Sequence, residues 1–236
     1  MTVCLCLLTY NELVGSKEDV PQIERDAFDQ IIAIDGGSTD GTVEYLKEQN
    51  IPVYKQPIPS LNAACHFAVE QCKTDAIIFF HPKGTIPVAD TLKFRPLFDE
   101  GYAFIVASRM TKHSTNEEDS SWWRPRKWFT MGLGLGDSIV FRKDGNKVLD
   151  VLHGFRGVTV EAFKAMQIKA KGVTVDQEMT IRSYQLSLKR IEFPTHEKPR
   201  LAGETHFPAL PTGWKHICHF AKETIQQFSS GSKQER

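Results

Sequence analysis

Five consecutive apolar residues, 76–80, are followed at once by His81-Pro82-Lys83-Gly84. A short run with no polar residue is typical of a strand that is covered on both faces, as in an α/β protein. Proline and glycine end the regular structure there, so His81 and Lys83 come at the carboxyl end of the strand. Because open α/β sheets bind their ligands at that edge, we expect this turn to lie in the functional site.

The same pattern recurs along the chain. Residues 2–8 lead into Thr9-Tyr10-Asn11-Glu12, residues 30–34 lead into Asp35-Gly36-Gly37-Ser38, and residues 103–109 end in Ser108-Arg109. A short strand is predicted at residues 51–55, and helices at residues 21–28, 41–49, 61–72 and 92–100. This alternation predicts an α/β fold with a single doubly wound, mostly parallel sheet flanked by helices, and we assign residues 1–212 to it.

The second half of the chain is less regular. Strands are predicted at residues 148–155, 173–175 and 188–193, helices at residues 159–167 and 176–185, and a surface loop at residues 111–121. Residues 213–236 form a separate C-terminal segment. Its apolar residues lie near helical spacing, so we expect an amphipathic helix over residues 214–228 that docks on the domain or on a partner, with a frayed end from Ser229.

Composition excludes several classes of function. The chain has 29 basic and 29 acidic residues in 236, so no global field favours nucleic acid. Its five cysteines show no paired spacing and follow no signal peptide, which argues against a zinc site or a disulfide framework. The apolar runs are shorter than the roughly 20 residues that cross a bilayer. We therefore expect a cytoplasmic protein.

A segment rich in tryptophan breaks this ordinary composition. Residues 122–129 read WWRPRKWF, in which three tryptophans are interleaved with three basic residues. Two interpretations are open. The segment contacts a membrane interface or an anionic, lipid-like substrate, in which case Trp122 and Trp123 lie on the acceptor side. Alternatively, it is a helix packed on the domain with its arginines outward.

Several motifs in order resemble those of one enzyme family. They are LLTYNE, IIAIDGGSTDGT, the SR that ends the strand through Val106, DVLHGFRG, VTVDQEM and IEFPTHEKPRLAGETHF. Together they resemble family 2 glycosyltransferases with the GT-A fold, and among these the dolichyl- and polyprenyl-phosphate sugar synthases. The resemblance covers residues 3–207. It implies an inverting hexosyltransferase that binds a UDP- or GDP-linked sugar across the carboxyl edge of the sheet.

The resemblance also implies roles for individual residues. The donor would be bound by Thr9, Tyr10, Glu12, Asp35, Gly37, Ser38, His81 and Arg109, and the acceptor side would include Asp150, Gly154, Phe155 and Arg156. Glu178, Asp176, Lys83 and Arg200 would act in catalysis, with Arg109 and Arg200 facing phosphates. Structural roles remain open for some of them. Asp35 can instead organise its own turn, Glu12 can cap one, and Arg109 and Arg156 can be buried partners of Asp150 or Glu178.

The sequence departs from the family at the turn that follows the predicted strand at residues 76–80. Relatives usually carry Asp-x-Asp where this chain has His81-Pro82-Lys83, and those carboxylates hold Mg²⁺ or Mn²⁺. Histidine and lysine suit these hard cations poorly, so no cofactor is expected and any Mg²⁺ or Mn²⁺ site is weakened, with Asp90 as the fallback ligand. Either Lys83 supplies the positive charge in place of the metal, or the protein binds nucleotide without turnover.

The acceptor decides whether a general base is needed. A polyprenyl phosphate is already an anionic nucleophile, whereas a saccharide hydroxyl must lose a proton, for which Glu178 or Asp176 would serve. A lipid acceptor would bring the enzyme to the inner face of the membrane as a peripheral protein. Two competing classes are a non-catalytic nucleotide-sugar-binding or assembly protein on the same fold, and a nucleotidyltransferase, against which the lack of an N-terminal glycine- and lysine-rich loop argues.

Overall fold

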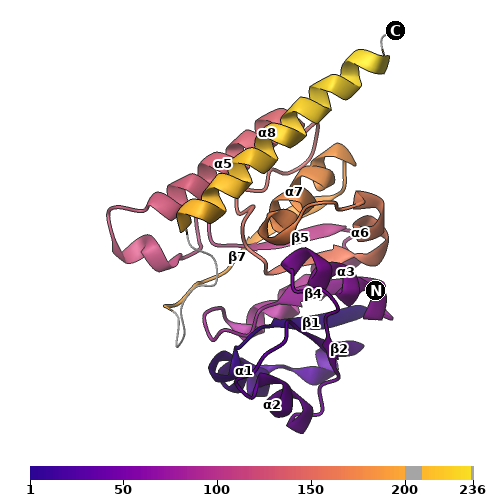
Figure 1. The fold of residues 1–236 in the computed structure, drawn as a ribbon, viewed down its shortest axis with the longest axis vertical. Coiled ribbons are helices and arrows are strands. Elements are labelled where there is room, and N and C mark those ends of the chain that lie inside the picture. Colours follow the sequence, from indigo (N-terminus) through magenta and orange to yellow (C-terminus); the bar gives the residue numbers. More distant parts are fainter. Residues whose placement is uncertain (200–208, 235–236) are drawn as a thin grey trace.

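The computed structural model describes residues 1–199 and 209–234. The strands are β1 (Val3–Thr9), β2 (Gln30–Asp35), β3 (Val53–Lys55), β4 (Ala76–Phe80), β5 (Phe104–Ser108), β6 (Arg156–Thr159) and β7 (Arg190–Pro194). The α-helices are α1 (Leu13–Asp19), α2 (Thr42–Glu48), α3 (Leu61–Gln71), α4 (Phe94–Asp99), α5 (Pro125–Phe141), α6 (Val160–Met166), α7 (Val175–Gln185) and α8 (Ala209–Gln234). Figure 1 shows the helices on both faces of a central sheet, with α8 as the outermost rod.

One sheet runs through the molecule in the order β3-β2-β1-β4-β6-β5-β7. All pairs are parallel except those of β6, which is antiparallel to both β4 and β5. The predicted α/β fold with a doubly wound, mostly parallel sheet is therefore confirmed. Reversal of β6 places its first residue, Arg156, beside Phe79 of β4 and Val106 of β5, close to the carboxyl ends of both strands.

The strands are buried on both faces, as their unbroken apolar runs predict. Residues such as Cys6 and Phe79 point into a core covered by α3, α5, α6 and α7. Their neighbours in sequence, such as Leu7 and Phe80, point into the opposite core, which Leu46 of α2 and Phe98 of α4 help to fill. Two apolar layers therefore hold the sheet rigid beneath the loops at its edge.

Some predicted elements are wrong in place or type. The strand predicted at residues 148–155 is instead a non-strand segment before β6, and its polar members Asp150 and His153 are used in side-chain contacts. The helix predicted at residues 21–28 is two short 3-10 turns, while the regular helix, α1, lies just before it. A 3-10 turn also replaces the short strand predicted at residues 173–175.

The C-terminal helix is present, and it packs on the domain with its polar side instead of with the predicted apolar stripe. Its buried side chains are His216, His219 and Glu223, whereas the apolar residues of the predicted stripe, among them Trp214 and Phe228, are exposed. The helix also continues to Gln234, past the predicted end at Ser229. A polar network anchors it, because His216 Nδ1 lies 3.0 Å from Gln177 Oε1, and Gln177 Nε2 donates to Asp137 at 3.2 Å.

Candidate active site

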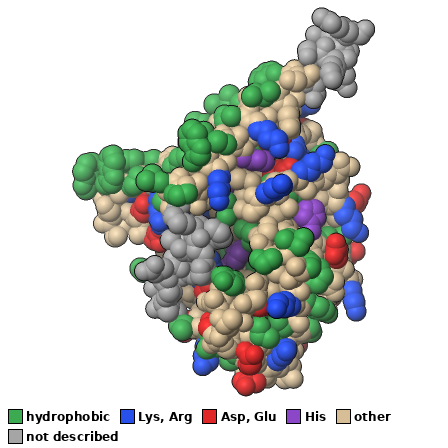
Figure 2. Space-filling view, viewed as in Figure 1, with side chains coloured by type: hydrophobic (Ala, Val, Ile, Leu, Met, Phe, Trp, Pro, Cys, Tyr) green, Lys and Arg blue, Asp and Glu red, His purple; other side chains and the backbone are tan. Residues whose placement is uncertain are grey.

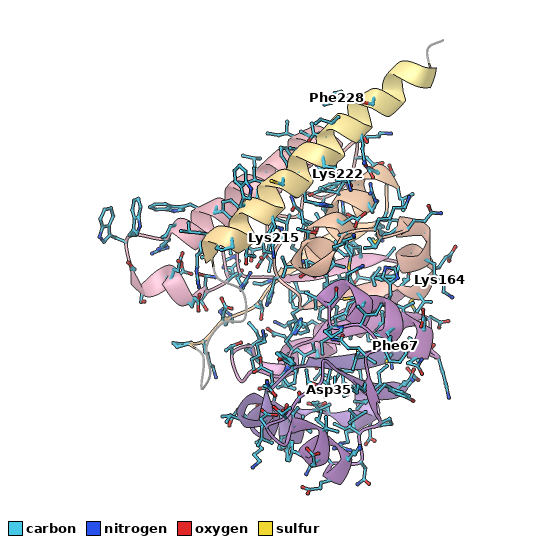
Figure 3. All side chains as sticks on the ribbon, viewed as in Figure 1. Asp35, Phe67, Lys164, Lys215, Lys222 and Phe228 are labelled. Carbon is cyan, nitrogen blue, oxygen red and sulfur yellow. The ribbon has the colours of Figure 1, made fainter. Side chains whose placement is uncertain are left out.

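Four polar segments meet at the carboxyl edge of the sheet. They follow β1, β2, β4 and β5, and the antiparallel β6 adds the residues that precede Arg156. This edge is the location that the sequence predicts for the functional site. In Figure 3, Asp35 marks the β2 end of the edge, in the half of the molecule opposite α8.

The loops after β1 and β2 are tied together through Asp35. Its carboxylate accepts hydrogen bonds from the Thr9 hydroxyl at 3.0 Å, the backbone N–H groups of Gly37 and Ser38 at 2.8 Å each, and the Ser38 hydroxyl at 2.5 Å. Only 2% of Asp35 is exposed. These contacts organise the turn, which is the structural role that the sequence left open for Asp35. A hydroxyl of a bound nucleoside would have to share or replace one of them.

Asn11, which the sequence-based site omitted, locks the two loops in register. Its backbone has a φ of 52°, in the left-handed region, and its side-chain oxygen accepts from Thr39 N–H at 2.8 Å. Its own N–H donates to the Ser38 hydroxyl at 2.8 Å. The exposed Tyr10 ring lies beside Gly36, where an added Cβ would be 3.2 Å from Tyr10 Cδ2. An asparagine just after a predicted strand was the sequence signal for this role of Asn11, because asparagine tolerates a positive φ.

The His81-Pro82-Lys83 turn packs directly on α1. Lys83 Nζ lies 4.0 Å from Glu12 Oε1, which pairs the turn with the loop after β1. Gly84 N–H donates to the Asp19 carboxylate at 2.8 Å, and burial raises the pKa of Asp19 to about 6. The predicted donor residue Glu12 and the predicted catalytic residue Lys83 are thus brought together.

Gly15 permits this close packing, and its replacement by alanine should disturb the turn. An added Cβ would lie 2.4 Å from the Pro82 carbonyl oxygen and 2.5 Å from Lys83 Cα, both backbone atoms that cannot rotate away. We expect Gly15→Ala to lower the free energy of unfolding by about 1–3 kcal/mol, measured by urea denaturation. Gly132→Ala is the control, because no atom lies within 4 Å of its Cβ position. Equal stability of the two variants would contradict this packing.

Gly154 lies beside both His81 and Asp176. A Cβ on Gly154 would be 2.6 Å from His81 Nε2 and 3.8 Å from Asp176 Oδ2, so only glycine fits beside the ring. Burial, assisted by the charge of Lys83, holds the pKa of His81 well below its ordinary value, so the ring is neutral near pH 7. Burial likewise raises the pKa of Asp176. The structure thus joins His81, Gly154 and Asp176 into one cluster.

Arg156 supports this cluster from below and is fully buried. Its Nε lies 3.2 Å from Asp176 Oδ1, its Nη1 donates to the Asp176 carbonyl oxygen at 2.6 Å, and its guanidinium lies over the Phe104 ring at 5.6 Å. The predicted pairing of Arg156 with Asp150 or Glu178 is therefore wrong, since its carboxylate partner is Asp176. Of this predicted acceptor-side turn, Gly154 and Arg156 border the His81–Asp176 cluster, whereas Phe155 packs in the apolar core.

Arg109 is held by two carboxylates. Its Nε and Nη2 each donate to Asp150 at 2.9 Å, and its Nη1 donates to Glu197 at 3.1 Å. Although burial opposes ionisation, the Arg109 guanidinium lowers the pKa of Asp150 to about 2. The possibility that Arg109 is a buried partner of Asp150 is confirmed. Glu197 was missed because nothing in HEKPR distinguishes a surface glutamate from a partner contributed across the fold.

Glu178 lies in a different environment from Asp176, although both are on α7. It is fully buried, it accepts backbone hydrogen bonds from Lys169 at 3.0 Å and from Ala170, and it pairs with Arg182 at 2.8 Å. These contacts fix the segment between α6 and α7. Asp176 lies beside Gly154 and pairs with Arg156, whereas none of these contacts of Glu178, among the described residues, involves either of them.

The other predicted residues have varied surroundings. Trp122 and Trp123 are exposed and pack on each other, with ring centroids 5.8 Å apart. Neither ring therefore fits the interpretation in which this segment is a helix packed on the domain. Asp90 is buried and engaged by the Thr195 hydroxyl at 2.6 Å and by Lys93 at 2.7 Å. Arg200 lies outside the described residues.

The donor set at the β4 turn does not fit a divalent metal. Across residues 1–199 and 209–234, no group of three or more histidine, cysteine, aspartate or glutamate side chains could hold one. The turn offers a neutral imidazole and an ammonium group; of the carboxylates beside it, Glu12 is paired with that ammonium and Asp19 accepts from Gly84 N–H. Hard cations prefer several oxygen ligands, so the described residues at this position provide no such site.

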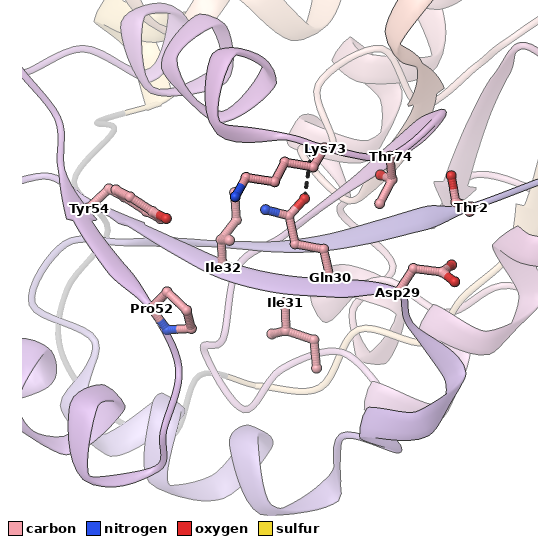
Figure 4. Close-up of a pocket in the computed structure, with 9 residues that line it drawn as sticks. All are labelled: Thr2, Asp29, Gln30, Ile31, Ile32, Pro52, Tyr54, Lys73 and Thr74. Atoms are coloured by element: carbon pink, nitrogen blue, oxygen red, sulfur yellow. Dashed lines mark hydrogen bonds between the residues drawn. The ribbon is translucent and has the colours of Figure 1, made fainter.

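A hollow of about 330 Å³ lies elsewhere, and Figure 4 shows that Thr2, Asp29, Gln30, Lys73 and Thr74 contribute to its walls. Gln30 Oε1 accepts a hydrogen bond from Lys73 N–H at 2.7 Å there. These residues precede β1, β2 and β4, so the hollow is at the amino edge of the sheet. It contains none of the predicted site residues.

Comparison with known proteins gives the family. Glycosyl transferase family 2 matches residues 4–166. The chain is 26% identical over 206 residues to glycosyltransferase AglJ of Haloferax volcanii, which covers 85% of this chain and 64% of that protein, so it spans less than two thirds of this relative. Its fold is similar to that of Mycobacterium tuberculosis glucosyl-3-phosphoglycerate synthase.

Two structures of that synthase illustrate the likeness. The complex with UDP has a TM-score of 0.67 at 15% identity, covering 94% of this chain and 80% of that one. The complex with Mn²⁺, UDP-glucose and phosphoglyceric acid has a TM-score of 0.66 at 14% identity, covering 94% and 79%. The family match extends over most of the present chain, and the sheet order and helix layers agree with the GT-A fold. This chain belongs to glycosyl transferase family 2 and has the GT-A fold.

Proposed function

We propose that the protein transfers a sugar, with inversion, from a UDP- or GDP-linked donor to a lipid-phosphate or saccharide acceptor, without a metal. The observation that carries the metal-free part is the placement of Lys83 at the carboxyl end of β4, between the β1 loop and the His81–Asp176 cluster. An ammonium group about 4 Å from a phosphate oxygen offsets several kcal/mol of developing negative charge at an effective dielectric of about 20, before desolvation is subtracted.

The loops after β1 and β2 would bind the nucleoside. Thr9, Asn11, Asp35 and Ser38 form a rigid network that leaves the Tyr10 ring exposed for stacking on a base. The role of Gly37, with a φ of 98°, is to let the backbone turn at this point. Arg109 would act at the phosphates only indirectly, because Asp150 and Glu197 already occupy its guanidinium.

The acceptor determines the role of Asp176. Its pKa is raised by burial, and a carboxylate of raised pKa accepts a proton from a sugar hydroxyl more readily than an ordinary one. A lipid phosphate needs no such base. In that case we propose that the enzyme works as a peripheral protein at the inner membrane face. No helix within the described ranges is long and apolar enough to span a membrane.

A nucleotide-binding or assembly protein without turnover is the second candidate. It is favoured by the engagement of both Arg109 and Arg156 with carboxylates, which leaves Lys83 as the main candidate cation at the site. This protein would bind the same nucleotides but release no nucleoside diphosphate from any sugar conjugate.

Thermal unfolding with nucleotides tests the proposal. UDP or GDP, or a sugar conjugate of one, should raise the melting temperature, since a ligand at about 100 times its Kd stabilises the fold by about 2.7 kcal/mol. EDTA should leave this shift and sugar transfer unchanged. Absence of a shift with every nucleoside diphosphate and its sugar conjugates would contradict donor binding. A rise in melting temperature without sugar transfer to either a lipid-phosphate or a saccharide acceptor would favour the second candidate.

A further inference from the structure

The C-terminal helix presents its apolar side to solvent. Exposed residues recur along α8 at spacings of three or four and form one stripe, with 88% of Leu210, 66% of Trp214, 66% of Ile225 and 69% of Phe228 exposed. An amphipathic surface helix of a globular protein buries this side. The stripe runs over 19 residues, from Leu210 to Phe228, a rise of about 27 Å along the helix.

The neighbouring helix α5 also exposes apolar residues, although Phe141 on its other side is buried in the core. Its polar residues Thr130, Asp137 and Ser138 are buried, whereas Trp128, Leu135 and Ile139 are exposed on one stripe. The two helices lie side by side in Figure 1, and Phe141 of α5 packs edge-on against Phe220 of α8 at 6.1 Å. Figure 2 shows hydrophobic side chains gathered over α8 and around the start of α5. We call this surface the α5–α8 face.

The exposed, described charged side chains of α5 and α8 themselves are all basic, while Glu117 and Asp119, just before α5, are paired with basic residues. Both acidic residues of these helices whose side chains are described, Asp137 and Glu223, are buried. The exposed charged residues are Arg126, Lys215 and Lys222, and Figure 3 shows the two lysines along α8. Arg126 is paired with Glu117, which leaves the lysines of α8 as the dominant charge of the face.

We propose that the α5–α8 face binds the surface of an anionic lipid bilayer, with α8 lying in the plane of the interface. Tryptophans at one end, aliphatic residues and phenylalanine along the stripe, and lysines beside it match the side-chain chemistry of interfacial helices. A second copy of the chain fits less well, because a two-fold contact would bring the lysines of α8 close to their own symmetry mates. The inference supplies the surface for the proposed membrane location but does not depend on sugar transfer.

Binding of the full chain to vesicles tests this inference without any nucleotide or acceptor. The protein should co-sediment with vesicles of phosphatidylcholine and phosphatidylglycerol and less with vesicles of phosphatidylcholine alone. Brominated lipids should quench its tryptophan fluorescence. Ile225→Ser combined with Phe228→Ser should weaken binding on the order of a hundredfold, because serine transfers much less apolar surface from water to the bilayer than isoleucine or phenylalanine. Lys215→Gln with Lys222→Gln should weaken binding to the anionic vesicles by on the order of tenfold.

A matched change elsewhere serves as the control. Ile58 is 62% exposed, close to Ile225 at 66%, but it follows β3, far along the chain from both helices. Ile58→Ser should bind vesicles as the unmodified chain does. Equal binding by the Ile225/Phe228 variant, or no binding by the unmodified chain, would overturn the proposal. A dimer in sedimentation equilibrium that this variant dissociates, without vesicle binding, would instead assign the face to self-association.

Discussion

Replacement of Lys83 by alanine should weaken binding of the nucleoside diphosphate by about 10- to 100-fold. The ammonium group is the proposed counter-charge for the donor's phosphates, and a hydrogen bond to a charged group contributes about 1.5–3 kcal/mol. Its loss also removes a positive charge 4.0 Å from the Glu12 carboxylate, so the proposed phosphate site becomes more negative. Isothermal titration with UDP and GDP, in EDTA, measures the effect directly.

Three matched variants separate the causes. Lys83→Arg retains the charge and should bind within a few fold of the unmodified chain. Lys83→Ala with Glu12→Gln removes both charges and should recover part of the lost affinity. Lys47→Ala removes an exposed lysine on α2 and should change nothing. Strict dependence of binding on Mn²⁺ in the unmodified chain, or unchanged affinity in Lys83→Ala, would rule out replacement of the metal by this lysine.

Asp176→Asn should lower kcat with a saccharide acceptor by about 10²–10⁴-fold, the range usually lost with a general base. Asparagine keeps the size of the side chain and can still contact Arg156, so the variant should fold. With a polyprenyl phosphate acceptor the loss should be much smaller, because that nucleophile is already ionised. Steady-state rates with both acceptors, at saturating donor, give the comparison.

Glu178→Gln is the partner experiment on the same helix. This side chain holds Lys169 and Ala170 and pairs with Arg182, so its change should lower the free energy of unfolding by about 1–3 kcal/mol and leave the rate per folded molecule nearly unchanged. Urea denaturation and active-site-normalised rates distinguish the two effects. A loss of kcat in Glu178→Gln that equals or exceeds the loss in Asp176→Asn would reverse the assignment of the base.

The sequence predicted the parts of the fold that depend on local periodicity. The strands at β1, β2, β4 and β5, and the polar residues at their ends, follow from apolar runs, and after β2 and β4 also from glycine or proline. The reversal of β6 could not be predicted, because its four residues, Arg156–Thr159, pair with strands far away along the chain. The apolar segment before β6 was therefore taken for the strand itself.

Partner choice among charged residues was the weakest prediction for the site. The sequence spacing did not favour Asp176 over Glu178 as the partner of Arg156. In the structure, α7 directs Asp176 toward β6 and Glu178 toward the segment after α6. The same limit applies to Arg109, whose second partner, Glu197, lies 88 residues away. Such pairs depend on tertiary geometry, which periodicity does not encode.

The inverted docking of α8 also affects what holds the C-terminal segment to the rest of the protein. Most amphipathic helices adhere through the hydrophobic effect, which changes little with salt or pH. Here the contact passes largely through His216, Gln177 and the ion pair of Glu223 with Arg182, apart from the Phe141–Phe220 contact. Detachment of α8 would expose these polar groups to water, and it would take the exposed apolar stripe of α8 away from the domain. The attachment of α8 should therefore depend on salt and pH more than that of a helix held by apolar packing alone.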